Sequence, residues 1–202
     1  MGIRAHQQDE LVEEAARIMC EQGLVDYRAA KAKAAERLGV PAGTPLPANS
    51  QVHDAVLAYQ QLFGGQRHHQ QLQAMRETAI KAMELLEEFE PRLVGALLSG
   101  AIHDGHRIQL HAFADMPEAL DFLLEDRGIA CQPGERRYRV GKRDTRQFPM
   151  LQFEAGGHGI DVTIFPESGG RNPPLSPVDG KPMRRLTLTA ARKLLEAEQG
   201  GG

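Results

Sequence analysis

The chain has 202 residues, enough for one large domain or two small ones. Apolar residues make up 41% of the chain and charged residues 25%, which excludes a disordered or collagen-like protein. The formal net charge of −3 and the pI near 6.2 argue against a nucleic-acid coat protein, so nucleic acid is not an expected partner.

The two cysteines, Cys20 and Cys131, lie far apart and lack the CxxC spacing of a zinc site. We interpret them as thiols in a reducing compartment rather than as a disulfide scaffold. No run approaches the roughly 18 apolar residues of a membrane span, and the N-terminus has no apolar signal region. These observations predict a cytoplasmic protein with no membrane partner.

The first 90 residues have the hydrophobic period of helices. Four helices are predicted, over residues 9–22, 26–38, 50–63 and 72–89. Asp26 and Ser50 are predicted N-caps, and Pro91 is predicted to end the fourth helix. The apolar seam of residues 72–89 serves either the chain's own core or a homodimer.

After Pro91 the pattern changes to short strands. Strands are predicted over 93–98, 107–113, 136–140, 148–154 and 159–165, and helices over 116–126 and from Thr187 or Thr189 to Ala197. Gly156-Gly157 predicts a tight hairpin, because glycine accepts positive φ. The predicted fold is α+β: a helical region over 1–90, a mixed sheet flanked by helices over 91–199, and a flexible tail over 200–202.

An apolar strand with an early glycine is followed by two strands of alternating polarity. The three segments are Leu93-Val-Gly-Ala-Leu-Leu-Ser-Gly100, His106-Arg-Ile-Gln-Leu-His-Ala-Phe113 and Gly159-Ile-Asp-Val-Thr-Ile-Phe165. Over about residues 91–165 this order resembles the nucleotidyltransferase superfamily. The resemblance implies a Gly-Ser pair near the nucleotide phosphates and three carboxylates that hold two Mg²⁺ ions. Such a site is chemically sensible, because residues i and i+2 of a strand share a face and Mg²⁺ prefers oxygen ligands.

Two of the three implied metal ligands are absent. Arg107 and Gln109 stand where the family has its two aspartates, and only Asp161 takes the place of the third carboxylate. A guanidinium has no lone pair for a metal. We therefore expect Arg107 to pair with Asp161, in an arrangement that still suits phosphate recognition. The alternative is that all three are polar residues on the wet face of half-buried strands.

The resemblance and the alternation define a candidate site without an assigned metal ligand. Asp161 is the candidate catalytic residue. The candidate ligand-binding residues are Gly95, Ser99, Gly100, Arg107, Gln109, His111, Lys181 and Arg184. The proline-rich loop 173–185 is predicted to be a lid over the polar face of the sheet, with Lys181, Arg184 and Arg185 as anion contacts.

Three further features of the sequence can be interpreted either as functional sites or as purely structural features. The stretch 136–146 has six basic residues in eleven, and is either a phosphate or RNA surface or a guarded edge strand. A metal site is conceivable from His103, Asp104, His106 and Asp161. These residues match no known zinc pattern, and solvated loop histidines are the alternative. The first two helices are interpreted as a packing module rather than a DNA-reading helix-turn-helix.

Three classes of function follow. The first is a nucleotidyltransferase-like protein with a lost or weakened two-metal site that binds a nucleotide or phosphorylated ligand in a regulatory role. The second is an active enzyme that moves a nucleotidyl group from a nucleoside triphosphate with Mg²⁺, using Asp161 with Asp104 or Glu154, to a small molecule or protein. The third is a non-catalytic protein-interaction module, since a fold does not determine chemistry. No cofactor is assigned firmly.

Overall fold

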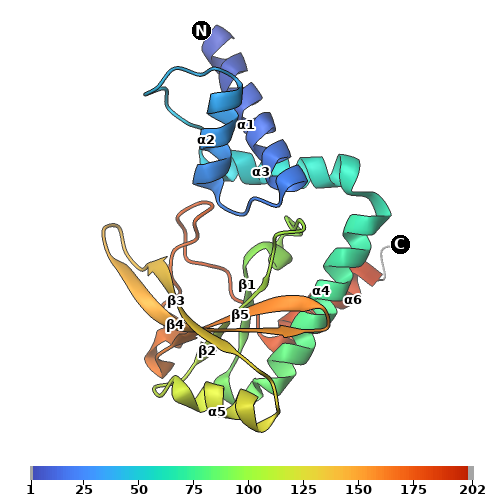
Figure 1. Cartoon of the computed structure of the whole chain (residues 1–202), viewed down its shortest axis with the longest axis vertical. Coiled ribbons are helices and arrows are strands. Elements are labelled where there is room, and N and C mark those ends of the chain that lie inside the picture. The colour runs from blue at the N-terminus through green and yellow to red at the C-terminus, as the bar shows by residue number, and fades with distance from the viewer. Residues whose placement is uncertain (1, 200–202) are drawn as a thin grey trace. The chain divides into compact units, whose positions relative to one another are not determined.

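The computed structural model describes residues 2–199, with side chains for residues 6–197. The tail predicted for 200–202 lies outside the described residues. The chain divides into two compact units. The first unit comprises the chain up to Gln70, Ser99–His106 and Pro177–Asp179, and the second comprises Gln71–Leu98, Arg107–Ser176 and the chain from Gly180. Helices and a mixed sheet are both present, so the predicted α+β class is confirmed (Figure 1).

The first unit is helical, with α1 (Gly2–Gln22), α2 (Tyr27–Arg37), α3 (Asn49–Tyr59) and a π-helical turn (Gln60–Gly64). The cap predicted for the second helix is confirmed, because the Ala29 N–H donates to Asp26 Oδ1 over 2.7 Å. Ser50 is not the cap of α3. The helix begins one residue earlier, with Ala48 at the N-cap position, and the Gln51 side chain accepts the Ala48 N–H and stabilises this start.

The core of the first unit draws on all three helices and on a distant segment. Its larger buried members are Leu11, Ile18, Met19, Val52 and Val56, packed with Ala15, Ala16, Ala30, Ala34 and Ala101. Ala101 comes from the segment Ser99–His106. In the same segment the Ile102 carbonyl accepts a hydrogen bond of 2.7 Å from the Gln60 side chain. This short segment is therefore part of the helical unit, although the chain around it belongs to the sheet.

Helix α4 (Gly65–Leu85) supplies the apolar seam that the sequence indicates, and a 3-10 turn (Glu87–Phe89) follows it. The helix ends at Leu85, before Pro91, and Phe89 is buried in the turn that follows. Six seam residues are buried within the chain itself: Leu72, Met75, Ala79, Ala82, Leu86 and Phe89. The seam thus serves the chain's own core. For the same reason the boundary between the units lies at Gln70, rather than near the expected residue 90.

The second unit is built on a five-stranded sheet of order β1-β2-β5-β4-β3. Its strands are β1 (Arg92–Val94), β2 (Ile108–Phe113), β3 (Gln132–Arg139), β4 (Thr145–Ala155) and β5 (His158–Phe165), and its other helices are α5 (Glu118–Asp126) and α6 (Leu188–Gln199). Strands β2 and β5 are parallel, and the other pairs are antiparallel. The hairpin predicted at Gly156-Gly157 is confirmed, with φ of +58° and +77°.

The first strand is shorter than predicted. It ends at Val94, where Gly95 adopts φ +81°, and a 3-10 turn (Gly95–Leu98) follows. Leu97 is buried in that turn. A short apolar run shows burial but does not distinguish a strand from another buried segment, which explains the difference.

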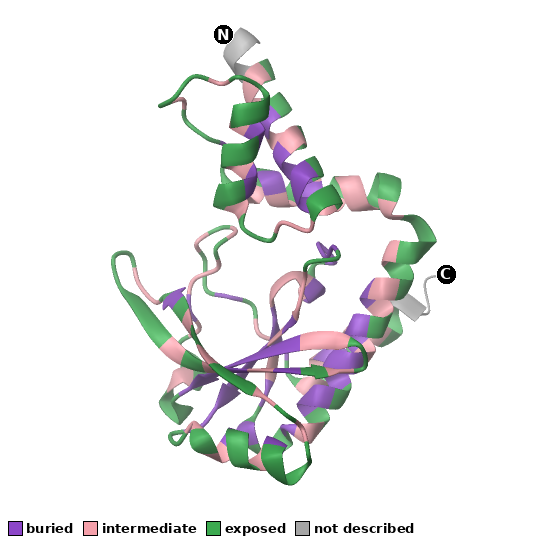
Figure 2. Cartoon of the chain, viewed as in Figure 1, coloured by how far each residue is buried: buried purple, intermediate pink, exposed green. Residues whose placement is uncertain are grey.

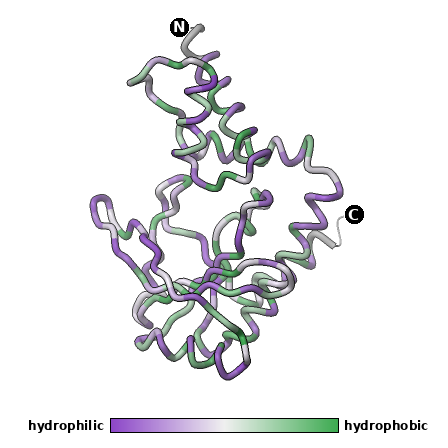
Figure 3. The backbone as a smooth tube through the Cα atoms, in the orientation of Figure 1, coloured by the Kyte–Doolittle hydropathy of each residue, from purple (hydrophilic) through white to green (hydrophobic). Residues whose placement is uncertain are grey.

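Alternation along the central strands separates two faces of the sheet. On one face the side chains are apolar and buried: Ile108, Leu110 and Ala112 of β2 with Ile160, Val162 and Ile164 of β5. The other face carries polar and aromatic side chains, and we call it the polar face. The central strands are buried and the long hairpin of β3 and β4 is largely exposed (Figure 2). The tip of this hairpin is hydrophilic (Figure 3).

None of the helices in residues 2–199 combines the length and the apolar character that a membrane crossing needs.

Candidate site on the polar face of the sheet

The polar face gathers candidate residues from adjacent strands of the second unit. In the register, Gln109 of β2 lies opposite Asp161 of β5, and Asp161 lies opposite Gln152 of β4. Paired residues of neighbouring strands lie on the same face of a sheet. Arg136 of the outer strand β3 reaches the same carboxylate. The strand pairing therefore brings one acid, two amides and a guanidinium together.

Asp161 is buried, and both of its carboxylate oxygens accept hydrogen bonds. Oδ1 accepts from Arg107 Nε over 2.6 Å and from Gln152 Nε2 over 3.0 Å. Oδ2 accepts from Arg136 Nη1 over 3.5 Å. The expected pair of Arg107 and Asp161 is present. We call these four residues the Asp161 cluster; its two guanidinium groups and one carboxylate leave it with an excess of positive charge.

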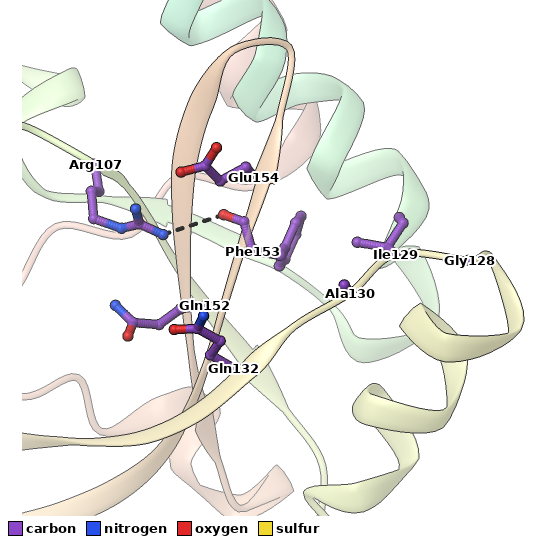
Figure 4. A pocket seen from close by; sticks show the side chains of 8 residues that line it. All are labelled: Arg107, Gly128, Ile129, Ala130, Gln132, Gln152, Phe153 and Glu154. Atoms are coloured by element: carbon purple, nitrogen blue, oxygen red, sulfur yellow. Dashed lines mark hydrogen bonds between the residues drawn. The ribbon is translucent and has the colours of Figure 1, made fainter.

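The backbone of the sheet fixes the Arg107 side chain. Its guanidinium lies across Gly159 of β5, where any Cβ would collide with Nη1. Nη2 donates to the Phe153 carbonyl over 3.2 Å and to the Ile160 carbonyl over 3.3 Å (Figure 4). Because Arg107 immediately precedes β2, the strand's register sets where this guanidinium lies.

Gly95, which follows β1, lies beside Gln109 of β2. A Cβ on Gly95 would lie 2.9 Å from Gln109 Oε1, so only glycine leaves room for the amide there. The positive φ of Gly95 adds a second reason for glycine. Gly95, Gln109 and Asp161 are therefore neighbours in the structure.

The other members of the implied phosphate loop are placed differently. Ser99 and Gly100 belong to the first unit, whereas Gly95 and the Asp161 cluster belong to the second. The histidines of the conceivable metal site, His103 and His106, are also in the first unit, with their rings 4.0 Å apart. The structure therefore assigns these residues to a different compact unit from that of Asp161.

The residues present do not fit a two-metal centre. The Asp161 oxygens already accept three hydrogen bonds, and Arg107 would repel a cation. Asp104 lies in the first unit, 3.7 Å from Arg67. Within residues 2–199, no three His, Cys, Asp or Glu side chains converge in a way that could hold a metal ion. Among the described residues, His103, Asp104 and His106 belong to a different compact unit from Asp161, and Asp161 and Glu154 are not part of any group of three such side chains.

His111 lies farther along the polar face, fully buried. Its Nδ1 accepts a hydrogen bond of 2.9 Å from Arg185 Nε, so Nε2 carries the ring proton and lies 3.1 Å from the Tyr138 hydroxyl. Burial, with Arg185 and Arg136 nearby, holds the pKa of His111 well below its usual value. In this structure His111 is therefore neutral and buried, and a ligand on the protein surface would not contact it directly.

Of the three basic side chains expected from the loop, Arg185 turns toward the sheet and Lys181 and Arg184 are exposed. The Arg185 guanidinium lies over the rings of Phe113 and Phe165, 5.1 and 4.8 Å from their centroids. Its Nη1 donates to the carbonyls of the turn at 169–170. Burial lowers the pKa of Arg185 to about 10. The loop therefore covers the aromatic part of the polar face.

A cavity of about 550 Å³ lies next to the Asp161 cluster, between β4 and the segment that leads into β3. Arg107, Gln132, Gln152 and Glu154 provide its polar wall, and Ile129, Ala130 and Phe153 its apolar wall, with Gly128 (Figure 4). Figure 4 shows Glu154 and Gln152 on either side of the Arg107 guanidinium. The cavity thus offers one guanidinium, one carboxylate and two amides beside an apolar surface.

Sequence reasoning did not single out Arg136, Gln152 or Tyr138 as parts of this face. Arg136 and Tyr138 alternate within the basic stretch 136–146, and this two-residue period is the signal that places both on one face of β3. On β4, Phe148, Met150 and Gln152 follow the same two-residue period. Their partners could be identified only once the order of the strands was known.

Comparison of the chain with protein-family models, with curated proteins and with solved structures finds no match.

Proposed function

We propose that the second unit is a nucleotidyltransferase-like domain that binds a nucleotide or another phosphorylated ligand on its polar face, without a two-metal site and in a regulatory role. The observation that carries the proposal is the Asp161 cluster, in which two guanidinium groups share one carboxylate. One positive charge at this point has no partner within the cluster. A phosphate group supplies the matching negative charge and suits the planar donors of arginine.

Access to solvent supports this proposal. The side chains of Arg107 and Arg136 are 35% and 32% exposed, whereas that of Asp161 is 10% exposed. Both arginine side chains thus keep solvent-accessible surface that a ligand can contact, while the carboxylate stays covered. Asp161 accepts hydrogen bonds from both guanidinium groups and offsets one of their two positive charges.

The neighbouring cavity supports a nucleotide as the ligand. Its volume of about 550 Å³ falls within the range of small-molecule sites. Ile129 and Phe153 offer apolar contact for a base, and the amides of Gln132 and Gln152 offer donors and acceptors for base or ribose. Glu154 accepts hydrogen bonds from ribose hydroxyls, on the side of Arg107 opposite Gln152.

Isothermal titration with ATP, with and without Mg²⁺, tests the proposal. We expect binding in both conditions, because arginines rather than metal ions neutralise the phosphates. Arg136→Gln removes a charge-assisted hydrogen bond worth roughly 1.5–3 kcal/mol, so the affinity should fall about tenfold or more. The matched control is Arg137→Gln, since Arg137 lies on the opposite face of the same strand, and it should bind ATP as the unaltered chain does.

Asp161→Asn distinguishes binding from catalysis. The variant should bind ATP as tightly as the unaltered chain or more tightly, because it lacks the negative charge that opposes phosphate. Neither protein should transfer label from radioactive ATP. Absence of ATP binding in both metal conditions, binding that requires Mg²⁺, or label transfer abolished by Asp161→Asn would each overturn the proposal.

We also propose that the protein works in the cytoplasm. Cys20 and Cys131 are free cysteines. Burial raises the pKa of both thiols to about 11, for Cys131 together with the hydrogen bond to Asp121. Both thiols are therefore protonated at neutral pH, and it is their free, unbridged state that supports a reducing compartment.

A further inference from the structure

The first unit has an apolar groove of about 960 Å³ between α1 and the end of α3 with its π-helical turn. Val12 and Ala16 of α1 line one side, and Tyr59, Leu62 and Phe63 line the other. All of these residues belong to the first unit, so the groove is complete within that unit. It is separate from the polar face of the sheet.

Two large apolar side chains at this groove are exposed. Leu62 is 76% exposed and Phe63 is 70% exposed, the highest values among the large apolar residues described. Phe63 contacts Tyr59, with ring centroids 4.7 Å apart. Figure 2 shows the turn that follows α3 as exposed. Exposed apolar side chains gathered at a groove are typical of a surface that binds another protein.

The π-helical turn is what presents these two side chains. Turns of this kind are rare and occur often at functional positions. Gly64 closes the turn, and a Cβ there would lie 2.8 Å from His68 Cβ and 2.9 Å from Gln60 Oε1. The backbone path that brings Leu62 and Phe63 to the groove therefore requires a glycine at its end.

The rim of the groove is acidic. Five carboxylates and one guanidinium line it: Asp9, Glu10, Glu13, Glu14, Glu21 and Arg17. Arg17 already binds Glu14 over 2.7 Å, with Glu21 3.7 Å away. Asp9 and Glu13 are exposed. The groove is thus an apolar surface bordered by negative charge.

We propose that this groove docks an amphipathic helix of a partner protein, with apolar residues at spacings of three and four and Lys or Arg beside them. The apolar stripe of such a helix covers Leu62 and Phe63, and its basic residues face the carboxylates of α1. Helices of this type bind grooves between helices through apolar anchors one turn apart. Charge complementarity chooses a basic helix over an acidic one. The proposal does not depend on the function proposed for the sheet.

Fluorescence anisotropy with two labelled 18-residue peptides tests it. Both peptides carry leucine at helical spacing; the other positions are lysine in one and glutamate in the other. We expect the lysine peptide to bind the full chain at least about tenfold more tightly than the glutamate peptide. Phe63→Ser and Glu13→Lys should each weaken its binding by about tenfold, because one removes an anchor and the other reverses a rim charge.

Matched controls lie outside the groove. Phe122→Ser replaces a 65% exposed aromatic residue of α5, and Glu36→Lys reverses an exposed charge of α2. Both should bind the lysine peptide as the unaltered chain does. Absence of peptide binding, equal binding of the two peptides, or equal sensitivity of the controls would overturn the proposal. Sedimentation showing a dimer that Phe63→Ser separates would overturn it too, because the occupant would then be a second copy of the chain.

Discussion

At the scale of single residues, the neighbours of Asp161 on the polar face determine what this carboxylate can do. A carboxylate among other carboxylates attracts a cation, whereas this carboxylate accepts hydrogen bonds from two arginines and a glutamine. Asp161 is therefore part of an internal ion pair. The cluster can therefore attract an anion, which is the opposite electrostatic preference.

A second residue-scale feature is the pair of adjacent histidine rings in the first unit, His103 and His106. His103 is buried, and among the described residues its two ring nitrogens have no hydrogen-bond partner. Burial lowers the pKa of His103 to about 4, although Asp104 acts in the opposite direction. Burial and the neighbouring His103 lower the pKa of His106 to about 3. Both rings are therefore neutral at pH 7.

The titration of His103 makes the free energy of unfolding depend on pH. Between the ordinary histidine pKa of 6.5 and about 4, the unfolded chain binds a proton at His103 and the folded chain does not. The free energy of unfolding should therefore fall as the pH falls through this window, by up to about 3 kcal/mol for His103. Urea denaturation followed by circular dichroism at pH 7 and pH 4.5 measures the fall.

His103→Gln removes this titration, so its fall in stability should be smaller than that of the unaltered chain. His69→Gln, at an exposed position, should keep the full fall. A fall that is the same in all three proteins would show that His103 is protonated in the folded chain.

At the scale of elements, the parallel pair β2 and β5 positions the site. Its register sets Gln109 against Asp161 and brings Arg107 over Gly159. The outer strands then add Gln152 and Arg136. A shift of one residue in any of these strands would turn the side chains to the apolar face. The buried apolar residues that alternate with these side chains therefore fix the strand register, and the register positions the site.

Gly159→Ala tests how closely β5 and Arg107 fit. The added methyl group would displace the guanidinium and break its hydrogen bonds to Asp161 and to two carbonyls. We expect the free energy of unfolding to fall by roughly 1–3 kcal/mol. Gly134→Ala is the control, because its methyl group would make ordinary contacts with Met150, and it should change stability by less than about 0.5 kcal/mol. Equal effects in urea denaturation would contradict this account.

At the scale of the whole molecule, the units do not follow the order of the chain. The helical unit includes residues 99–106, which lie between β1 and β2 of the sheet unit. Ala101 packs in the helical core, and Ile102 accepts a hydrogen bond from Gln60. Gly105 lies against the Gly23 backbone, where no Cβ would fit. The helical unit is therefore incomplete without this insertion.

This organisation predicts how fragments behave. A fragment of residues 1–70 should be less stable than the same fragment joined through a flexible linker to residues 99–106. The joined segment restores the Ala101 contacts and the hydrogen bond to Gln60. Urea denaturation followed by circular dichroism compares the two. Equal midpoints would show that the helices need nothing from the second half of the chain.

Features that depend on neighbours along the chain could be predicted from the sequence. Asp26 caps a helix, and Gly156-Gly157 forms a hairpin. The alternation of apolar and polar residues places Gln109 and Asp161 on the polar faces of their strands. The pairing of Arg107 with Asp161 was expected from two opposite charges on predicted strands, and the ion pair is present. Each of these inferences concerns local conformation or a resemblance in pattern.

The remaining features depend on contacts between residues that are far apart in the sequence. In the structure the first strand ends at Val94, and the apolar seam of α4 is buried within the chain's own core. Ser99 and Gly100 belong to the helical unit. The tertiary structure also brings Arg136, Gln152 and Arg185 to the polar face and leaves Leu62 and Phe63 exposed. The physical reason is common to all of these. Periodicity shows which face of an element is apolar, but the partner that covers the face depends on the order of strands and the paths of loops, which residues distant in the sequence decide together.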